Sequence, residues 1–249
     1  MIALDNVHKV FNRGKANQVN AVNGISLHIS EGEFLVIVGS NGSGKTTLLN
    51  LVAGSVLPDE GTISINDNDV TRLHDYQRSK WIARVFQNPL SGTAPDLSII
   101  DNFRLAAIRT KPKGLSIGIT NAFKQKVRGR IATLGMGLEN KIEQPMGTLS
   151  GGQRQALTLL MSVTDTCKVL LLDEPTAALD PRSAGVVMET ADKLVKDFGL
   201  TSILITHTLK DAYNYGTRII QMSEGQIMKD LNDKEKSELT QSDIFSWFV

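Results

Sequence analysis

The chain has 249 residues, of which 41% are hydrophobic and 21% charged, so it can bury a full core, and its formal net charge of +1 gives no general argument for nucleic acid as a partner. A single cysteine, Cys167, excludes an internal disulfide. Because no apolar run approaches the ~20 residues of a spanning helix and the N-terminus lacks the sections of a signal peptide, we expect the chain to stay in the cytoplasm and to reach a membrane only through a partner.

The first predicted elements are strands. Apolar residues alternate along much of residues 2–29, on either side of a turn at residues 12–17. Phe11 closes the first strand and could either stack on a flat base or pack on the sheet as an ordinary aromatic residue. The chemistry of the side chain does not separate these two interpretations, because stacking leaves no spacing pattern.

Residues 34–54 predict a strand, a phosphate-binding loop and a helix. The apolar run 34–38 is typical of a strand buried on both faces, and apolar residues at helical spacing continue to Gly54. The segment between them matches the pattern glycine, four residues, glycine, lysine, serine or threonine. Its residues are Gly39, Ser40, Asn41, Gly42, Ser43, Gly44, Lys45, Thr46 and Thr47.

The chemistry of this loop suits a nucleotide. Its glycines let consecutive N–H groups point inward, where they favour a phosphate. Lys45 would reach the terminal phosphates, and the Thr46 hydroxyl would bind Mg²⁺. A glycine-rich turn with an exposed lysine is the alternative, and the correct strand, spacing and hydroxyl together disfavour it.

The middle of the chain predicts a second lobe. A short strand at residues 62–65 and another at residues 80–86 come first, and Pro89 marks the boundary just after Gln87. Apolar spacing is helical from about residue 97 to residue 148. Basic residues recur from Arg104 to Arg130, including Lys113, with no acidic residue between Asp101 and Glu139. This stretch indicates a solvated face, or else a surface for lipid head groups or an acidic partner.

Residues 149–153, Leu-Ser-Gly-Gly-Gln, predict the start of a helix. Ser150 and Gln153 have the spacing of a capping box, and Gly151 and Gly152 leave the first amides uncovered. A plain helix cap and a second phosphate site remain equally good interpretations at this point.

The apolar strand predicted at residues 169–172 ends in Asp173 and Glu174. Downstream of a phosphate loop, we expect Asp173 to hold Mg²⁺ and Glu174 to polarise the attacking water, although two adjacent acids could form only a solvated turn. His207 follows a strand predicted at residues 202–206 and is a candidate phosphate contact, because ligand-carrying residues gather at such strand ends.

Three further segments complete the chain. Asp180 followed by proline is a standard helix start, so a functional role for it needs outside support. A final hairpin is predicted at residues 218–228. The tail ends in Ile244, Phe245, Trp247 and Phe248, which we expect to dock on the body of the protein or to serve a partner.

The phosphate loop, residues 149–153 and the strand ending in Asp173 and Glu174 together resemble the ATP-binding subunit of ATP-binding-cassette (ABC) transporters. The likeness covers nearly the whole chain and follows the family's order. In family terms the motifs are the aromatic Phe11, Walker A at residues 39–46, the Q-loop at Gln87, the signature at residues 149–153, Walker B ending at Asp173, then Glu174, the D-loop at Asp180 and the switch histidine His207.

The resemblance implies a fold and the roles of several residues. The fold is α/β: a P-loop NTPase (RecA-like) core over residues 1–88 and 159–249, with an N-terminal antiparallel β subdomain and an inserted helical subdomain over residues 89–158. Phe11 is expected to stack on adenine, Gln87 to contact Mg²⁺ or the attacking water, and His207 to hold the γ-phosphate. Ser150, Gly151, Gly152 and Gln153 are expected to close over ATP bound to the second copy of the chain.

The resemblance also implies the activity and the partners. The activity is hydrolysis of ATP with Mg²⁺, carried out by a dimer of two chains around two ATP molecules. The partners are an integral membrane permease, which holds the protein at the inner face of the membrane, and a solute-binding protein outside the cell. Residues 92–97 and the basic stretch resemble importer ATPases whose permeases are similar to those for branched-chain or aromatic amino acids. A phosphate-loop kinase, an iron–sulfur assembly ATPase and an exporter or lipoprotein-release ATPase remain the alternatives.

Overall fold

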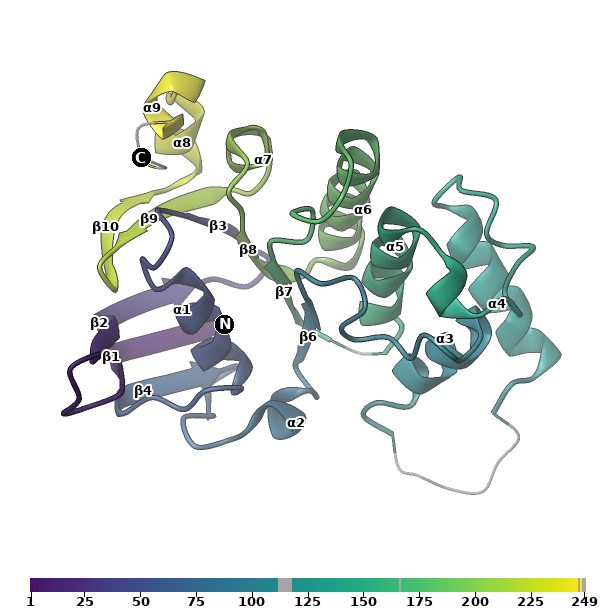
Figure 1. The fold of residues 1–249 in the computed structure, drawn as a ribbon, viewed down its shortest axis with the longest axis horizontal. Helices are drawn as coiled ribbons and strands as arrows, with labels where there is room; N and C mark the ends of the chain where they lie inside the picture. The colour runs from purple at the N-terminus through teal and green to yellow at the C-terminus, as the bar shows by residue number, and fades with distance from the viewer. Residues whose placement is uncertain (112–117, 166, 246, 248–249) are drawn as a thin grey trace.

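Two β-sheets carry the fold, and helix α1 (Lys45–Ala53) packs into a core shared with both of them (Figure 1). The computed structural model describes residues 1–111, 118–165, 167–245 and 247. The smaller sheet has the order β2-β1-β4-β5, and its strand pairs are antiparallel, which confirms the antiparallel N-terminal subdomain. Its strands are β1 (Ile2–Phe11), β2 (Val19–Ile29), β4 (Glu60–Ile65) and β5 (Asn68–Asp69).

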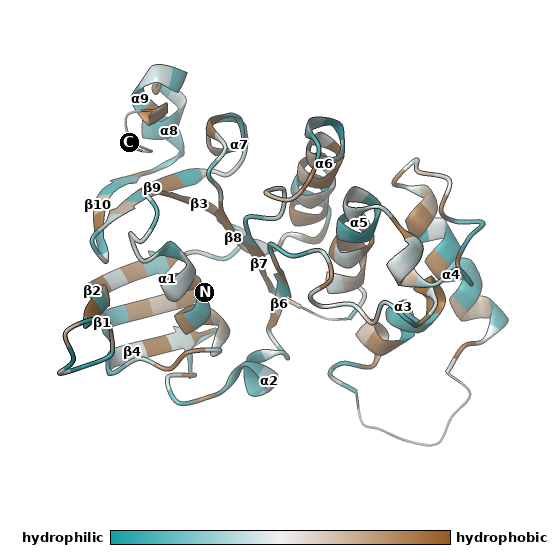
Figure 2. Ribbon diagram, viewed as in Figure 1, coloured by the Kyte–Doolittle hydropathy of each residue, from teal (hydrophilic) through white to brown (hydrophobic). Residues whose placement is uncertain are grey.

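The larger sheet forms the P-loop core. In the described part of the chain it has the order β10-β9-β3-β8-β7-β6, and the five strands from β9 to β6 run parallel. Strands β3, β7 and β8 are buried along their whole length, as their apolar sequences require, and they appear mostly brown in Figure 2. The strands are β3 (Phe34–Val38), β6 (Ile82–Val85), β7 (Val169–Asp173), β8 (Thr201–Ile205), β9 (Arg218–Ser223) and β10 (Gln226–Leu231).

Each of the longer helices other than α1, which follows the phosphate loop, has a side-chain N-cap. Ser98, Thr120, Ser150 and Asp180 each accept a hydrogen bond from a backbone N–H in the first turn of the helix that follows. These helices are α3 (Ile99–Ala107), α4 (Asn121–Ala132), α5 (Gly151–Ser162) and α6 (Pro181–Phe198). Shorter helical segments are α2 (Asp75–Arg78), η1 (Met146–Thr148), α7 (Leu209–Asn214), α8 (Asp233–Ser237) and α9 (Gln241–Phe245).

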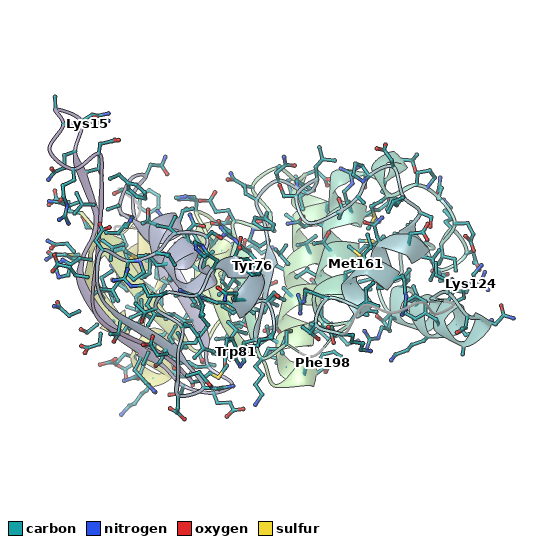
Figure 3. The ribbon with its side chains drawn as sticks, turned by 90° about the horizontal axis from the view of Figure 1, so that it is seen from below. Lys15, Tyr76, Trp81, Lys124, Met161 and Phe198 are labelled. Atoms are coloured by element: carbon teal, nitrogen blue, oxygen red, sulfur yellow. The ribbon has the colours of Figure 1, made fainter. Side chains whose placement is uncertain are left out.

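Helices α3, α4 and α5 pack against one another at one end of the molecule, with Lys124 of α4 far from Lys15 in the β1–β2 turn (Figures 1 and 3). The division at residues 88 and 158 stays a prediction. Helix α5 itself runs past residue 158 to Ser162.

The basic stretch is not a uniformly solvated face. Arg130 donates to the Val163 carbonyl and to Thr164 Oγ1 at 3.2 Å, and burial lowers the pKa of its guanidinium. Lys124 pairs with Glu143 at 2.7 Å. Lys113 lies outside the described residues. Part of this basic stretch therefore makes structural contacts to neighbouring segments.

Two further expectations about the elements have a clear outcome. The strand predicted at residues 80–86 is shorter, Ile82–Val85, because a turn follows α2, in which the Trp81 N–H donates to the Arg78 carbonyl at 2.9 Å. Helix α2 begins with a cap that periodicity did not reveal, in which Gln77 Oε1 accepts from the His74 N–H. The tail docks on the body as expected, since Ile244 and Trp247 are buried, whereas Phe245 is exposed. Phe248 lies outside the described residues.

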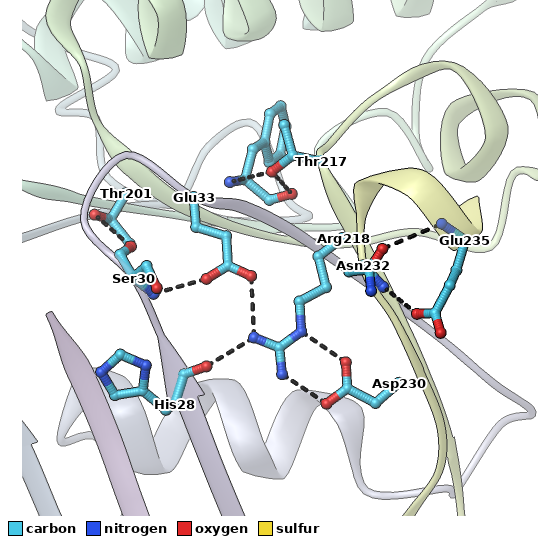
Figure 4. Close-up of polar contacts among 10 residues, drawn as sticks. His28, Ser30, Glu33, Thr201, Thr217, Arg218, Asp230, Asn232 and Glu235 are labelled. Atoms are coloured by element: carbon cyan, nitrogen blue, oxygen red, sulfur yellow. Dashed lines mark hydrogen bonds and ion pairs between the residues drawn. The ribbon is translucent and has the colours of Figure 1, made fainter. Parts of the chain in front are cut away.

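Arg218 joins the two sheets at one edge (Figure 4). Its guanidinium makes a bidentate pair with Asp230 of β10, with both distances 2.6 Å, and donates to Glu33 at 3.0 Å and to the His28 carbonyl of β2 at 2.7 Å. These acidic partners raise the pKa of Arg218 above its ordinary value, the Asp230 hydrogen bonds most of all. These contacts connect the start of β3 with β2 of the smaller sheet and with β9 and β10 of the larger sheet.

Arg78 forms hydrogen bonds to the C-terminal end of α1. The side chain is fully buried, and it donates to the backbone carbonyls of Leu51 at 2.7 Å, Val52 at 2.9 Å and Leu73 at 2.8 Å. Burial lowers its pKa to about 10. Two carbonyls in the last turn of the helix that follows the phosphate loop, those of Leu51 and Val52, are therefore bonded by one side chain.

We expect Arg78→Met to lower the free energy of unfolding by about 3 kcal/mol, because it leaves several buried carbonyls without donors. Urea unfolding followed by circular dichroism measures this change. Arg72→Met is the matched control, since Arg72 is exposed and donates only to the Pro58 carbonyl among the contacts described for it. Equal stability of the two variants would contradict the assigned role of Arg78.

Candidate functional site

The phosphate loop has the backbone that its glycines predict. Gly39 has φ +145°, and a Cβ there would lie 2.2 Å from the Met222 carbonyl oxygen. Gly44 has φ +100°, and its Cβ would lie 2.2 Å from the Ala21 carbonyl oxygen. Gly42 also has a positive φ, +81°, but has open space around it. Two of the three glycines are therefore required by both conformation and close backbone approach.

Lys45 is folded back onto the loop that carries it. Its ammonium, on a residue only 4% exposed, donates to the carbonyls of Gly39 and Ser40, both at 2.8 Å, and to Ser43 Oγ at 3.3 Å. Burial lowers the pKa of Lys45, and the negative charge of Glu174 opposes this change. The ammonium is thus held at the centre of the loop, where the phosphates of a nucleotide would replace the loop carbonyls as its acceptors.

Glu174 and His207 face each other across neighbouring strand ends. The distance from Glu174 Oε1 to His207 Nε2 is 2.7 Å, and the Glu174 N–H donates to the Ile205 carbonyl at 3.0 Å. Glu174 has φ +48°, a left-handed conformation that is uncommon for a residue with a side chain. That backbone turn directs the carboxylate toward the histidine rather than along the line of β7, so the two side chains form one polar unit.

Several of the predicted residues line one cavity of about 310 Å³ beside the loop. It includes Phe11, whose ring is 38% exposed and has the Lys9 ammonium 5.6 Å from its centroid. The other lining residues are Val19, Ala21, Asn41, Gly42, Gly44, Lys45, Thr46, Thr47, Glu174 and His207. Gln87, Asp173 and the signature residues are not in the lining of this cavity as far as the described residues show.

Asp173 is the last residue of β7, and Gln87 follows the end of β6 by two residues. Asp173 is 7% exposed, and its Oδ2 pairs with Arg84 at 2.6 Å. Gln87 is exposed directly after β6, where the Phe86 carbonyl accepts from Gln155 Nε2 of α5 at 2.9 Å. The residue is thus placed at the junction between the larger sheet and the second lobe.

The signature begins α5 as a complete capping box. The Ser150 side chain accepts from the Gln153 N–H at 3.3 Å, and the Gln153 side chain accepts from the Ser150 N–H at 3.2 Å. A Cβ on Gly152 would lie 2.4 Å from the Ser183 Cβ, so α5 and α6 meet closely at their N-termini. Gly151 has the Leu179 side chain 3.1 Å from its own Cβ position.

Asp180 is the N-cap of α6. Its Oδ1 accepts from the N–H groups of Arg182 and Ser183, both at 3.1 Å. The hydrogen bonds from Ser183 lower the pKa of this exposed carboxyl. This confirms the helix start predicted from the sequence, while a further role in a dimer stays a prediction.

Three of the predicted residues offer the oxygen donors that Mg²⁺ prefers. These are the Thr46 hydroxyl, the Gln87 side-chain amide oxygen and the Asp173 carboxylate. The donor chemistry fits a magnesium ion held together with nucleotide phosphates, because such an ion takes few protein ligands. The described residues contain no cluster of three or more His, Cys, Asp or Glu side chains that could hold a metal without such help.

The sequence reasoning missed Arg84 and the direct contact between Glu174 and His207. Arg84 could have been noticed as a lone charge inside an otherwise apolar strand beside the strand that ends in Asp173. For the Glu174 contact no local pattern exists, because it depends on the order of the strands in the sheet.

Comparison with known proteins decides the family. A family model described as ABC transporter matches residues 22–177, more than half of the chain. The chain belongs to the ABC transporter family. Like other ATP-binding proteins of that family, this ABC protein is an ATPase whose cofactors are ATP and Mg²⁺, and its core is the P-loop NTPase fold expected from the sequence.

Two relatives of this ABC protein are import or transport subunits by name. The tyrosine transport ATP-binding protein of Clostridioides difficile is 38% identical over 251 residues, which cover 100% of this chain and 98% of the relative. The phosphonates import ATP-binding protein PhnC of Agrobacterium fabrum is 31% identical over 228 residues, which cover 90% of this chain and 79% of PhnC.

Solved cassettes have the same architecture. The dimeric ATP-binding cassette MJ0796, in a post-hydrolysis state bound to ADP and Pi, is 29% identical to this ABC protein with a TM-score of 0.79. The match covers 94% of this chain and 99% of that cassette. Among the described residues, no helix combines the length and apolar character needed to cross a membrane.

We expect Gly39→Ala to abolish nucleotide binding and to lower the free energy of unfolding by more than about 2 kcal/mol, because the new Cβ meets the Met222 carbonyl. Gly42→Ala is the matched control: its φ is also positive, but the space around it is open, so about 1 kcal/mol is expected. Thermal unfolding and titration with a fluorescent ATP analogue measure both effects. Equal behaviour of the two variants would show that the close approach at Gly39 is unimportant.

Proposed function

We propose that this ABC protein powers the import of an amino-acid-like solute, in the manner of the tyrosine transport relative, through a separate membrane permease. The observation that carries the ATPase part is the Glu174–His207 pair at 2.7 Å in the lining of the cavity that also contains Lys45 and Thr46. A general base beside the phosphate loop is what hydrolysis needs, because the attacking water must lose a proton as it bonds to the γ-phosphorus.

The remaining residues have complementary roles in this proposal. Lys45 and the loop N–H groups hold the phosphates, and Phe11 stacks on adenine. Thr46, Gln87 and Asp173 would hold Mg²⁺, which would supply positive charge to the transferring phosphoryl group. Glu174 accepts the proton of the attacking water, and His207 orients that carboxylate and contacts the γ-phosphate.

The site is proposed to be completed by a second copy of the chain. The signature residues Ser150–Gln153 form a helix start, where a phosphate is favoured, with Ser150 exposed and Gly152 buried. None of them is among the described residues that line the cavity of their own chain. In a symmetric dimer each chain would offer this surface to the nucleotide on the other, with Asp180 at the same interface. The dimeric MJ0796 cassette supports this arrangement.

The permease is proposed to dock at the junction marked by Gln87. A cavity of about 520 Å³ between β6 and the second lobe offers the concave surface, lined by residues that include Arg84, Ala94, Leu105 and Arg109. Binding there would hold the protein at the inner face of the membrane, and a solute-binding protein would act on the far side of the permease. No nucleic-acid partner is part of this proposal.

We expect Glu174→Gln to keep ATP binding and to lower the rate of phosphate release by about 100-fold or more, because the general base is lost while the shape is retained. Phosphate release and binding of a fluorescent ATP analogue measure the two effects. Cells carrying this variant should lose uptake of labelled tyrosine. Normal turnover would contradict the role of Glu174, whereas lost turnover with unchanged uptake of aromatic and other amino acids would favour an iron–sulfur assembly or export ATPase.

A second prediction concerns the dimer. Ser150→Arg should block ATP-dependent dimerisation of the Glu174→Gln protein while nucleotide binding to the monomer is retained, because a long charged side chain enters the proposed interface. Light scattering with ATP measures the mass. Thr120→Arg, at the exposed N-cap of α4, controls for the loss of a helix cap, which costs about 1 kcal/mol. A dimer of normal stability in the Ser150 variant would contradict the interface.

A further inference from the structure

Arg84 connects three parts of the nucleotide-binding machinery. From β6 its guanidinium reaches Asp173 Oδ2 at the end of β7, at 2.6 Å, and Asn50 Oδ1 in α1, at 2.7 Å. The guanidinium carbon also lies 4.7 Å from the centroid of the Phe86 ring, next to Gln87. One side chain therefore contacts Walker B, the helix that follows the phosphate loop, and the residue before the Q-loop.

The contact with Asp173 has an electrostatic consequence. Both side chains are largely buried, with 13% of Arg84 and 10% of Asp173 exposed, so the attraction between their charges is only partly screened by water. The oxygen that Arg84 holds belongs to the carboxylate assigned to Mg²⁺. Arg84 therefore occupies one of the two oxygens that Asp173 could offer to a divalent cation.

Arg84 also has unused hydrogen-bonding capacity. Its Nε is buried and has no hydrogen-bond partner among the residues that the structure describes. Its side chain lines the cavity of about 520 Å³ between β6 and the second lobe. The guanidinium therefore borders a second cavity, separate from the nucleotide cavity, which has space for another orientation of the side chain.

We propose that Arg84 is a positioning residue that holds Asp173 away from magnesium until nucleotide is bound. This inference depends on the proposed assignment of Asp173 to the metal. Arg84 and Asp173 neutralise each other at a distance of 2.6 Å, which avoids an unpaired buried carboxylate. When Mg²⁺ and ATP enter together, Asp173 exchanges Arg84 for the metal, and the guanidinium turns toward the cavity at the second lobe.

A purely structural role for Arg84 predicts the opposite effect of its removal. If Arg84 only oriented the Asp173 carboxylate, leaving one oxygen for the metal, then its loss would weaken metal binding. If Arg84 competes with the metal, its loss strengthens metal binding. The sign of the change therefore separates the two roles.

The test measures Mn²⁺ affinity by electron paramagnetic resonance on the full chain, saturated with a non-hydrolysable ATP analogue. We expect Arg84→Gln to lower the apparent Kd for Mn²⁺ at least about threefold, the size of the effect of one nearby charge in a partly screened site. Lys80→Gln removes a charge from the same segment but not from Asp173, since Lys80 is exposed and lies over the Trp81 ring at 3.9 Å. That control should leave the Kd unchanged.

Asn50→Ala is the second variant, because Arg84→Gln leaves a buried carboxylate unpaired and could reduce stability. It removes one anchor of the guanidinium while the ion pair is kept, so a smaller decrease of the Mn²⁺ Kd is expected. An unchanged or raised Kd in Arg84→Gln, or in Asn50→Ala if the former does not fold, would overturn the proposal. Failure of the wild type to bind Mn²⁺ with nucleotide would instead contradict the metal site itself, and the inference about Arg84 with it.

Discussion

The parallel register of β3, β8 and β7 is the constraint on which the site depends. Ile37 and Asp173 both stand opposite Ile205, so the three strands end at one edge of the sheet. The phosphate loop, Glu174 and His207 each follow one of these strand ends. Hydrogen bonding between parallel strands therefore gathers residues that lie far apart in the sequence, and the buried apolar strands make a slip of register costly.

The polar groups of the site have partners within the chain. Lys45 donates to loop carbonyls, Asp173 pairs with Arg84, and Glu174 pairs with His207. Each contact occupies a group that the proposed mechanism assigns to phosphate, metal or water. In the proposed mechanism, binding is an exchange of partners, and the contacts within the chain limit the cost of holding charged groups in a largely buried site.

Much of the fold could be predicted from the sequence because its signals are local: apolar runs for the buried strands, a capping box at Ser150, and glycines where the loop requires positive φ. The family order of the motifs then indicated which residues share a site. The pair formed by Arg84 and Asp173 could not be predicted, since only the order of β6 and β7 brings these residues together. The left-handed turn at Glu174 is likewise set by tertiary contacts rather than by a propensity.

The close packing of Gly152 against Ser183 also matters for association. Because the N-termini of α5 and α6 pack closely there, Ser150 and Asp180 belong to one surface in which the two helix starts are held against each other. A surface that is already ordered loses little conformational entropy when another molecule binds to it. For this chain, the proposed contact with a second copy would therefore start from a preorganised face, and the absence of a side chain at residue 152 is what permits it.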